Sequence, residues 1–500
     1  MAISGIGGNP SPLLNAVRSI DDKLQDLQRQ LGTGQKSDTY SGLGSQAGVA
    51  VSLSAQLAAL SSYGDAISIV GTNINLAQSA LTQVANASGI VKNAAEVAPF
   101  DPGSSGVTTT QRTAQGQLDA ILAALNTQGS SGYMFSGTAS NQQSVESEDH
   151  ILNGNGSQAG LVQVIAERQQ ADLGTGSGRL VISAPTATSV SLAEDVAGSP
   201  FGFKLFGVSS SLTNAVVTGP TGSPAAISAD LTAGNPNDGD SITYTFTLPD
   251  GSSEKLTLQA TASTTPSANQ FSIGATPAAT AANLQAALNT AVGQLAQTSL
   301  SAASAMAAGN DFFGNPPQRI AGTSPFNAAT AMVAGTTANT VFWYTGENGP
   351  TPTRSTAVAR IDPSLSVSYG LRANEQGLRW LVQNSAVAAA MSYLPTDPNA
   401  PGRYAALNQR VNTALAIPSN VQNIQDIQAS LAGAQGAMSD ATDRHRQTQL
   451  TLTNLLQGIE GVSQDEVASQ IIALQTSLSA SLSTTARLAQ TSILNYLGPA

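Results

Sequence analysis

The 500-residue chain contains no cysteine and only two histidines. The missing thiols exclude a disulfide framework, thiolate catalysis and cysteine-based zinc or iron–sulfur sites. Charged residues make up 10% of the chain, against about 25% in an ordinary globular protein, and aromatic residues make up 4%. The surface must therefore consist mainly of small uncharged side chains. Such a surface favours packing against copies of the same chain, because little charge has to be desolvated; the alternative is a monomer with a bland polar surface.

Positive charge and targeting signals are also sparse. The formal net charge is −11, and the 20 Lys and Arg residues form no cluster, which argues against binding nucleic acid or an anionic membrane surface. Met1 to Pro12 contain neither the basic region nor the apolar run of a secretory signal peptide. No stretch approaches about 18 consecutive apolar residues, so we expect no membrane insertion. Export from the cell would need a route without a cleaved signal peptide.

What the chain does contain is heptad patterning at its N-terminal end. Apolar residues recur at alternating intervals of four and three, which is typical of helices that pair in coiled coils. The first stripe stops at Gly32 and Gly34. The second has Gly64 and Gly71 at two seam positions, where a neighbouring helix can approach closely. The stripes comprise Leu13, Val17, Ile20, Leu24, Leu27 and Leu31, then Leu53, Leu57 and Leu60 and further positions to Val91, with a third, shorter helix predicted over Leu118 to Leu125.

The C-terminal end has the same pattern. A stripe from Ile424 to Val462 includes Leu452, Leu455 and Ile459. Ser463-Gln464-Asp465-Glu466 is a capping box, which predicts that a new helix begins there. The apolar positions of this last helix include Leu474, Leu478 and Leu482, and the pattern ends near Leu497.

The middle of the chain changes to a period of two. Ile242 to Leu248, a turn at Pro249-Asp250-Gly251, and Leu256 to Leu258 predict a β-hairpin with an exposed turn. Further strands are expected at Val341 to Tyr344 and Leu365 to Tyr369, with a helix that begins at Pro277. The predicted fold is α+β: long terminal helices paired as a coiled-coil-like bundle, with β-rich α+β domains inserted. The predicted boundaries are residues 1–140, 141–390, in one or two lobes, and 391–500.

Both ends resemble the flagellin superfamily, over roughly the first 140 and last 110 residues. The N-terminal similarity lies in the first helix and the turn Leu31-Gly32-Thr33-Gly34-Gln35-Lys36, and the C-terminal similarity runs from Val462 to Leu497. Where the family usually carries an Asp-Asp-Pro-Ala or Asp-Asp-Ala-Ala-Gly segment, this chain has Ser41 to Gly48. This chain therefore departs from the family pattern in that loop, whereas the resemblance of the helical core is unaffected.

Within the superfamily, three segments resemble the hook-associated protein 3 type, which forms the junction between hook and filament. They are Gly132 to Thr138, the terminal Ser492 to Leu497 and, more weakly, Val367 to Glu375. The resemblance implies a non-enzymatic, extracellular structural subunit that self-assembles through its terminal helices. The implied partners are copies of itself, other flagellar axial proteins and an export chaperone. A filament flagellin is the alternative, and a surface adhesin or tail-fibre-like binding protein is a further one.

No residue pattern predicts a catalytic, metal or cofactor site. His150 follows the acidic run Glu146 to Asp149, which we interpret as a solvated loop and not as a metal site. His445 falls on the C-terminal seam, where it either fixes the register or makes a pH-sensitive contact. The glycines at 174, 176 and 178 precede an apolar run, as in a turn and unlike a phosphate loop, and Asn237 to Asp240 reads as a tight turn before a strand. An enzyme would require a pocket in which Trp343 and Tyr344 meet carboxylates.

Overall fold

The computed structural model describes the backbone of residues 12–496 and the side chains of residues 15–487. Two compact units divide the chain. The first contains the described parts of residues 1–70 and 436–500 together with residues 359–367, and the second contains residues 71–358 and 368–435. This division follows contact density, whereas the boundaries at residues 140 and 390 follow sequence character and remain a prediction.

The first unit consists mainly of helices, accompanied by a β-hairpin formed by β13 and β14. Its elements are α1 (Pro12–Thr33), the 3₁₀ segment η1 (Tyr40–Gln46), the beginning of α2 (Ala47–Val97), most of α10 (Ile424–Glu460), α11 (Gln464–Tyr496), β13 (Val358–Asp362) and β14 (Leu365–Ser368). These helices agree with the predicted stripes. The backbone N–H of Glu466 donates to Ser463 Oγ over 3.4 Å, which confirms that the capping serine begins α11.

The second unit contains the helices of the inserted region and the helical segments that precede and follow it in the chain. They are the end of α2, the start of α10, α3 (Thr109–Leu125), α4 (Glu148–Asn153), α5 (Leu161–Leu173), α6 (Pro277–Leu295), α7 (Ser301–Phe312), α8 (Gln376–Ala390) and α9 (Ala400–Leu415), with η2 (Ala296–Leu300), η3 (Phe326–Ala328) and η4 (Thr353–Thr356) as short segments. Helix α3 packs along α8, and α5 packs along α7. The predicted helix at Pro277 is confirmed, and the side chain of Thr276 caps it by accepting from the N–H of Ala279.

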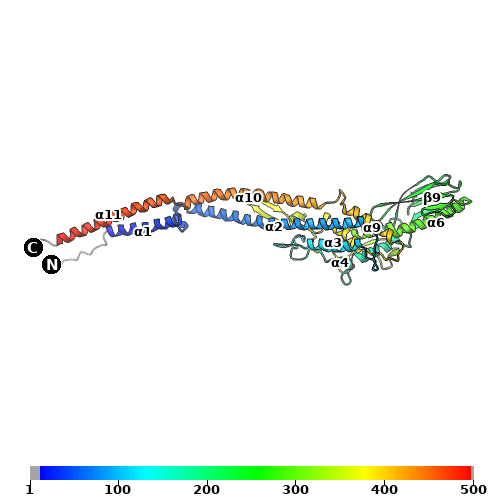
Figure 1. Cartoon of the computed structure of the whole chain (residues 1–500), viewed down its shortest axis with the longest axis horizontal. Helices are drawn as coiled ribbons and strands as arrows, with labels where there is room; N and C mark the ends of the chain where they lie inside the picture. Colours follow the sequence, from blue (N-terminus) through cyan, green and yellow to red (C-terminus); the bar gives the residue numbers. More distant parts are fainter. Residues whose placement is uncertain (1–11, 497–500) are drawn as a thin grey trace. The chain divides into compact units, whose positions relative to one another are not determined.

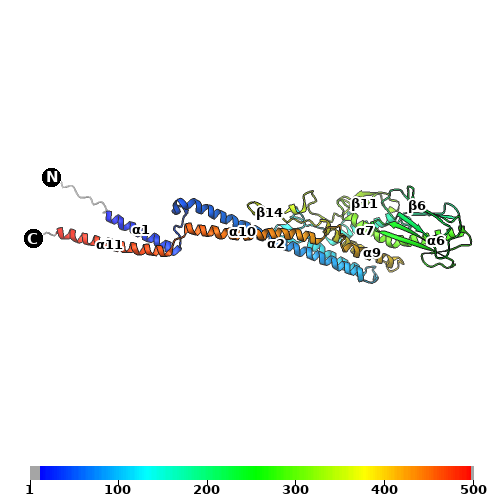
Figure 2. The ribbon, with the colours of Figure 1, turned by 90° about the horizontal axis from the view of Figure 1, so that it is seen from above.

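Two four-stranded sheets form a β-rich lobe in this unit. One has the order β3 (Leu180–Ser183), β4 (Ser189–Glu194), β7 (Ala226–Asp230), β6 (Val216–Thr221), and the other has the order β10 (Gln270–Ser272), β9 (Ser253–Thr261), β8 (Ser241–Thr247), β5 (Lys204–Ser210). Two-stranded sheets pair β1 (Gln128–Gly129) with β2 (Gly132–Tyr133), and β11 (Gln318–Ile320) with β12 (Met332–Ala334). Helix α6 packs against β9 and β10, and Figure 1 shows it beside β9. Figure 2 shows the same lobe from above, with α6 next to the strands. Both sheets and α6 share one hydrophobic core.

The lobe follows the sequence pattern closely. Strands β8 and β9 pair antiparallel from Ser241 opposite Gln259 to Thr247 opposite Ser253, which confirms the predicted hairpin. On β8 the alternate residues Ile242, Tyr244 and Phe246 are buried, as a period of two requires. The combination of these sheets with the long terminal helices is the predicted α+β fold.

Three local expectations were wrong. Residues 341–344 form no strand beyond an isolated bridge between Val145 and Tyr344, because the segment packs the ring of Trp343 against Phe313 and does not join a ladder. His150 lies in the short helix α4 and not in a loop, because Ser147 accepts the N–H of His150 as a helix cap. The turn after β8 is not fully exposed: the side chain of Asp250 is only 9% exposed, because it is ion-paired with Arg410.

Candidate assembly interface

The outermost described helices, α1 and α11, lie side by side (Figures 1 and 2). Leu24 and Leu27 of α1 and Val467 of α11 are buried, while Val17 and Ile20 are half-buried. The pair therefore has a narrow apolar seam, as a heptad stripe produces.

A short backbone connection joins the two ends of the chain beside this pair. The N–H of Val462 donates to the carbonyl of Gly34 over 3.0 Å, and the N–H of Lys36 donates to the carbonyl of Glu460 over 2.7 Å. The Lys36 ammonium also donates to the carbonyl of Ile459 over 2.9 Å. Gly34 has a φ of 71°, a left-handed conformation that ends α1 and that glycine adopts at little cost. The two turns that carry the flagellin resemblance are thus bonded to each other, and they place α1 antiparallel to α11.

The portions of α2 and α10 within the first unit meet through a second seam. Leu53 and Leu452 are buried, and Leu57, Leu60 and Ile459 are half-buried. In the second unit the same two helices are joined by amide hydrogen bonds, including Gln78 Nε2 to Gln435 Oε1 at 3.1 Å and Gln435 Nε2 to Asn75 Oδ1 at 2.8 Å.

His445 lies on this seam, where the stripe places it. Its ring is 8% exposed, and its centroid lies 5.9 Å from that of Tyr63. Nε2 is 3.5 Å from the carboxylate of Asp362, which also pairs with Arg444 over 3.4 Å. Sequence reasoning missed Asp362, because no local pattern connects the β13–β14 turn with a helix some 80 residues further along the chain.

The remaining predicted assembly residues have different environments in the single chain. Leu474 and Leu478 are half-buried, whereas Leu31 is 37% exposed and Leu455 and Leu482 are each 53% exposed. The side chain of Leu13 and all of Leu497 lie outside the described residues. Other exposed apolar side chains on these helices are Val49, Val51, Ile69, Leu76, Ile90, Val97, Leu450 and Ile472. The terminal helices therefore expose apolar side chains in addition to those that they bury within the chain.

The two seam glycines of α2 are open. A Cβ built on Gly64 or Gly71 meets no other atom within 4 Å. The close approach that these glycines would permit is therefore not used within the described chain.

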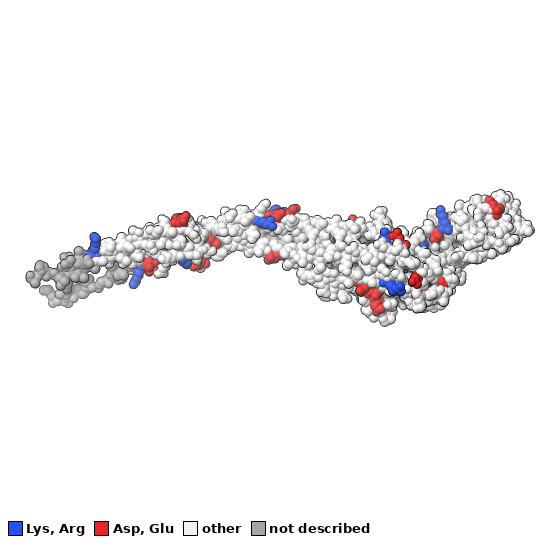
Figure 3. All heavy atoms as spheres, viewed as in Figure 1, with Lys and Arg blue, Asp and Glu red and all other residues white. Residues whose placement is uncertain are grey.

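Charge is sparse over the face shown in Figure 3, where Lys, Arg, Asp and Glu side chains stand in separate small groups. Consistent with this, the helical segment Tyr40–Val97 is long and apolar enough to cross a membrane by length and composition alone, and little of its most apolar stretch is buried. The criterion of consecutive apolar residues did not detect it, because Ser, Gly and Asn interrupt the run.

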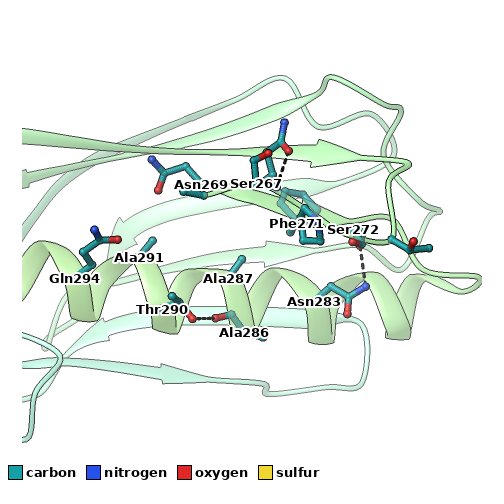
Figure 4. A pocket seen from close by; sticks show the side chains of 14 residues that line it. Ser267, Asn269, Phe271, Ser272, Asn283, Ala286, Ala287, Thr290, Ala291 and Gln294 are labelled. Atoms are coloured by element: carbon teal, nitrogen blue, oxygen red, sulfur yellow. Dashed lines mark hydrogen bonds between the residues drawn. The ribbon is translucent and has the colours of Figure 1, made fainter. Parts of the chain in front are cut away.

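Two pockets of the second unit offer little catalytic chemistry. The pocket beside Trp343 and Tyr344 has a volume of about 40 Å³, and its lining contains Arg379 but no carboxylate. A larger groove of about 400 Å³ lies between β10 and α6 and is lined by amide, hydroxyl and apolar side chains with no ionisable group (Figure 4). In Figure 4, Asn283 reaches from α6 to the carbonyl of Ser272, at 2.8 Å. Among the described residues, no group of three His, Cys, Asp or Glu side chains could hold a metal ion.

Buried ionic groups in this unit are explained by packing. The Arg168 guanidinium lies 2.9 Å from Asp172 and 2.7 Å from Asp311, and it covers the ring of Phe201 at 5.2 Å. Burial raises the pKa of both carboxyls, and the charge of Arg168 opposes that shift. Asp172 also accepts the N–H of Gly202 over 2.8 Å, so this cluster fixes α5 to α7 and to the neighbouring loop.

Paired terminal helices with a low charge and exposed apolar side chains are typical of structural subunits that assemble through their ends. Residues 11–140, which are 130 of the 500, match the family model of the bacterial flagellin N-terminal helical region. This match supports the flagellin superfamily and a structural subunit of the bacterial flagellum. That family is non-enzymatic and self-assembles into the extracellular axial structure. A comparison with curated proteins gave no match.

Proposed function

We propose that this protein is a hook–filament junction subunit of the hook-associated protein 3 type. The observation that carries the proposal is the contact between two segments that resemble that type, Gly132 to Thr138 and the part of Val367 to Glu375 that lies in the second unit. The N–H of Ala373 donates to the carbonyl of Phe135 over 2.8 Å, and the N–H of Gly137 donates to the carbonyl of Leu371 over 3.0 Å. Two sequence similarities far apart in the chain thus belong to one structural feature.

The residues inside this feature are buried and joined by hydrogen bonds and an ion pair. Phe135 and Ser136 are fully buried, and Ser136 Oγ lies 2.8 Å from Ser144 Oγ. Arg372 forms an ion pair with Glu347, whose N–H donates to the carbonyl of Ser136 over 2.9 Å. Because these hydrogen bonds and this ion pair join the two segments within the chain, the feature is suited to present a fixed surface to a neighbouring subunit.

The terminal helices supply the assembly surface in this proposal. The exposed apolar residues of α2, α10 and α11 and the open Gly64 and Gly71 would be covered by neighbouring axial subunits, including copies of the chain. The hydropathy of the Tyr40–Val97 segment then reflects burial in a protein polymer, with no membrane insertion. Export without a cleaved signal peptide and an export chaperone belong to the same proposal.

Electron microscopy of the purified protein, after addition of salt or of hook seeds, tests the junction role. A junction subunit should form one short ring on a hook seed and no long homopolymer. A filament flagellin, the alternative that the helical ends equally suit, should extend into long filaments from the same seeds. A protein that forms neither and binds cells or surfaces instead would support the adhesin alternative.

A further inference from the structure

A cavity of about 340 Å³ lies in the second unit, where the β8–β9 turn meets α7, α8 and α9. This volume is within the range of about 300–1,000 Å³ that small-molecule sites occupy. The side chains that matter in its lining are Asp250, Glu254, Trp380, Gln383, Asn384 and Arg410. None of them belongs to the terminal helices.

The positive charge in this cavity is already used within the protein. Arg410 Nε donates to Asp250 Oδ2 over 2.8 Å, and Nη1 donates to the carbonyl of Ala406 over 3.0 Å. Nη2 donates to Ser252 Oγ over 3.3 Å and lies 4.0 Å from Glu254. Three of the five guanidinium N–H groups are therefore already bonded within the chain, and the positive charge is paired with a carboxylate.

Acceptor capacity, by contrast, remains unused. Asn384 is fully buried, and its Nδ2 donates to the carbonyl of Trp380 over 2.7 Å, but its Oδ1 is buried without a hydrogen-bond partner. An unsatisfied buried acceptor costs about 1–3 kcal/mol. The side chain of Glu254 is 32% exposed and has no contact closer than the 4.0 Å approach of Arg410 among the ion pairs of the described residues.

The net charge and the aromatic surface of the cavity both favour a cation. Two carboxylates, Asp250 and Glu254, face one guanidinium, Arg410, so the lining has a net charge of −1. The ring of Trp380 is half-buried and fixed in place, because its Nε1 donates to the carbonyl of Ala414 over 2.8 Å. An indole face next to excess negative charge attracts cations.

We propose that this cavity binds a small organic cation with N–H donors, an alkylguanidinium or a primary ammonium compound. Its N–H groups donate to Asn384 Oδ1 and to the carboxylate of Glu254, its charge balances the surplus carboxylate, and its body lies against Trp380. A neutral polyol would leave the negative charge unbalanced. A quaternary ammonium ion would leave the acceptor of Asn384 unsatisfied.

Calorimetric titration of the full, unpolymerised chain with agmatine, whose guanidinium and ammonium ends make it a dication, tests the proposal. The bis-quaternary dication 1,4-bis(trimethylammonio)butane, which has the same charge but no N–H donor, and neutral glucose are the probes for comparison. Agmatine should bind at least about tenfold more tightly than either probe, and added salt should weaken it, because the contact is partly ionic. Tryptophan fluorescence gives an independent signal, since Trp343 and Trp380 are the only two tryptophans. The Trp343→Phe variant should retain the change on binding, which assigns it to Trp380.

Glu254→Gln is the decisive variant, because Glu254 is partly exposed and its loss leaves the Arg410–Asp250 pair in place. It should weaken agmatine binding about tenfold or more. Glu148→Gln on α4 removes the same charge away from this cavity and should bind agmatine like the original chain. Equal binding of agmatine and glucose, unchanged affinity in Glu254→Gln, or no agmatine binding at all would overturn the proposal.

Titration of the chain assembled on hook seeds distinguishes two sources of the cation. A free cation binds the assembled chain and the free chain alike. If a Lys or Arg side chain of a neighbouring copy occupies the cavity, agmatine binds only the free chain. Both results support recognition of an N–H cation and differ in where it comes from.

Discussion

The β-rich lobe and the α1–α11 pair bury their apolar residues to different extents. In the lobe, Tyr244, Phe246 and Leu258 are each at most 1% exposed, within a core to which two sheets and a helix contribute. In the helix pair, Ile472 is 64% exposed and Leu482 53% exposed. A sheet and helix sandwich encloses its core, whereas two helices can only cover one stripe each. The lobe can therefore be stable within one chain, and the pair gains stability when other helices cover it.

Limited proteolysis should give the largest contrast between the two regions. We expect cleavage within α1 and α11 in the free chain, because narrow helix pairs open easily, and an intact fragment that contains the β-rich lobe. Mass spectrometry of the fragments locates the cuts. In an assembled polymer the same sites should be protected. Equal protection of the ends in both forms would mean that the pair is stable without partners.

The double variant Leu474→Ala with Leu478→Ala tests whether the α11 stripe carries assembly. Burial of a Leu typically contributes about 2–5 kcal/mol, and in a polymer the loss recurs in every subunit. We expect assembly and motility to be lost, while circular dichroism and secreted-protein levels show a folded, exported chain. Ser477→Ala with Ser479→Ala changes exposed positions of the same helix and should assemble normally. Motility retained by the Leu variant would place assembly elsewhere.

Within the second unit, Arg410→Met should destabilise the hairpin by about 3 kcal/mol, because it leaves the carboxylate of Asp250 without its partner. The two side chains are 13% and 9% exposed, so water replaces little of the lost contact. Urea unfolding measures the loss. Deletion of residues 249–253 removes Asp250 and should also destabilise the second unit. An exposed turn without this ion pair would tolerate the same deletion.

Arg446→Met is the matched control for this ion pair. Its contact with Asp443 over 3.3 Å has side chains that are 69% and 65% exposed. Exposed pairs contribute about 0–1 kcal/mol, so this variant should unfold almost like the original chain. A similar loss in both variants would show that burial does not set the strength of these pairs.

Much of this contrast was predictable from the sequence, because heptad stripes and alternating strands are local patterns. The starts of α6 and α11 followed from Pro277 and Ser463, which act on adjacent residues. Contacts that join distant segments were not predictable in this way. Asp362 beside His445 and Arg410 beside Asp250 each depend on how separate elements pack, and single charged residues carry no signal of their partner. The Trp343 segment failed as a strand because aromatic packing outweighed its β-propensity.

The smallest expected effect is the loss of stability at alkaline pH that the buried tyrosines cause. Burial raises the pKa of Tyr393 and of Tyr244, since the phenolate would have to lie in an apolar interior. Because the phenol loses its proton at lower pH in the unfolded chain than in the folded one, the folded state has its full stability below the unfolded pKa of about 10. That stability is then lost as pH rises from the unfolded pKa through the folded pKa. Each such tyrosine should therefore lower the free energy of unfolding by about 1.4 kcal/mol per pH unit above pH 10.

Urea midpoints between pH 9 and 11, on the original chain and on Tyr393→Phe and Tyr244→Phe, measure this slope. Both variants should show a shallower loss, and Tyr393→Phe should also be more stable at neutral pH, because it removes a buried hydroxyl that has no hydrogen-bond partner among the described residues. Slopes identical to that of the original chain in both variants would mean that these rings are exposed before they ionise, and the second unit would then open as readily as the helix pair.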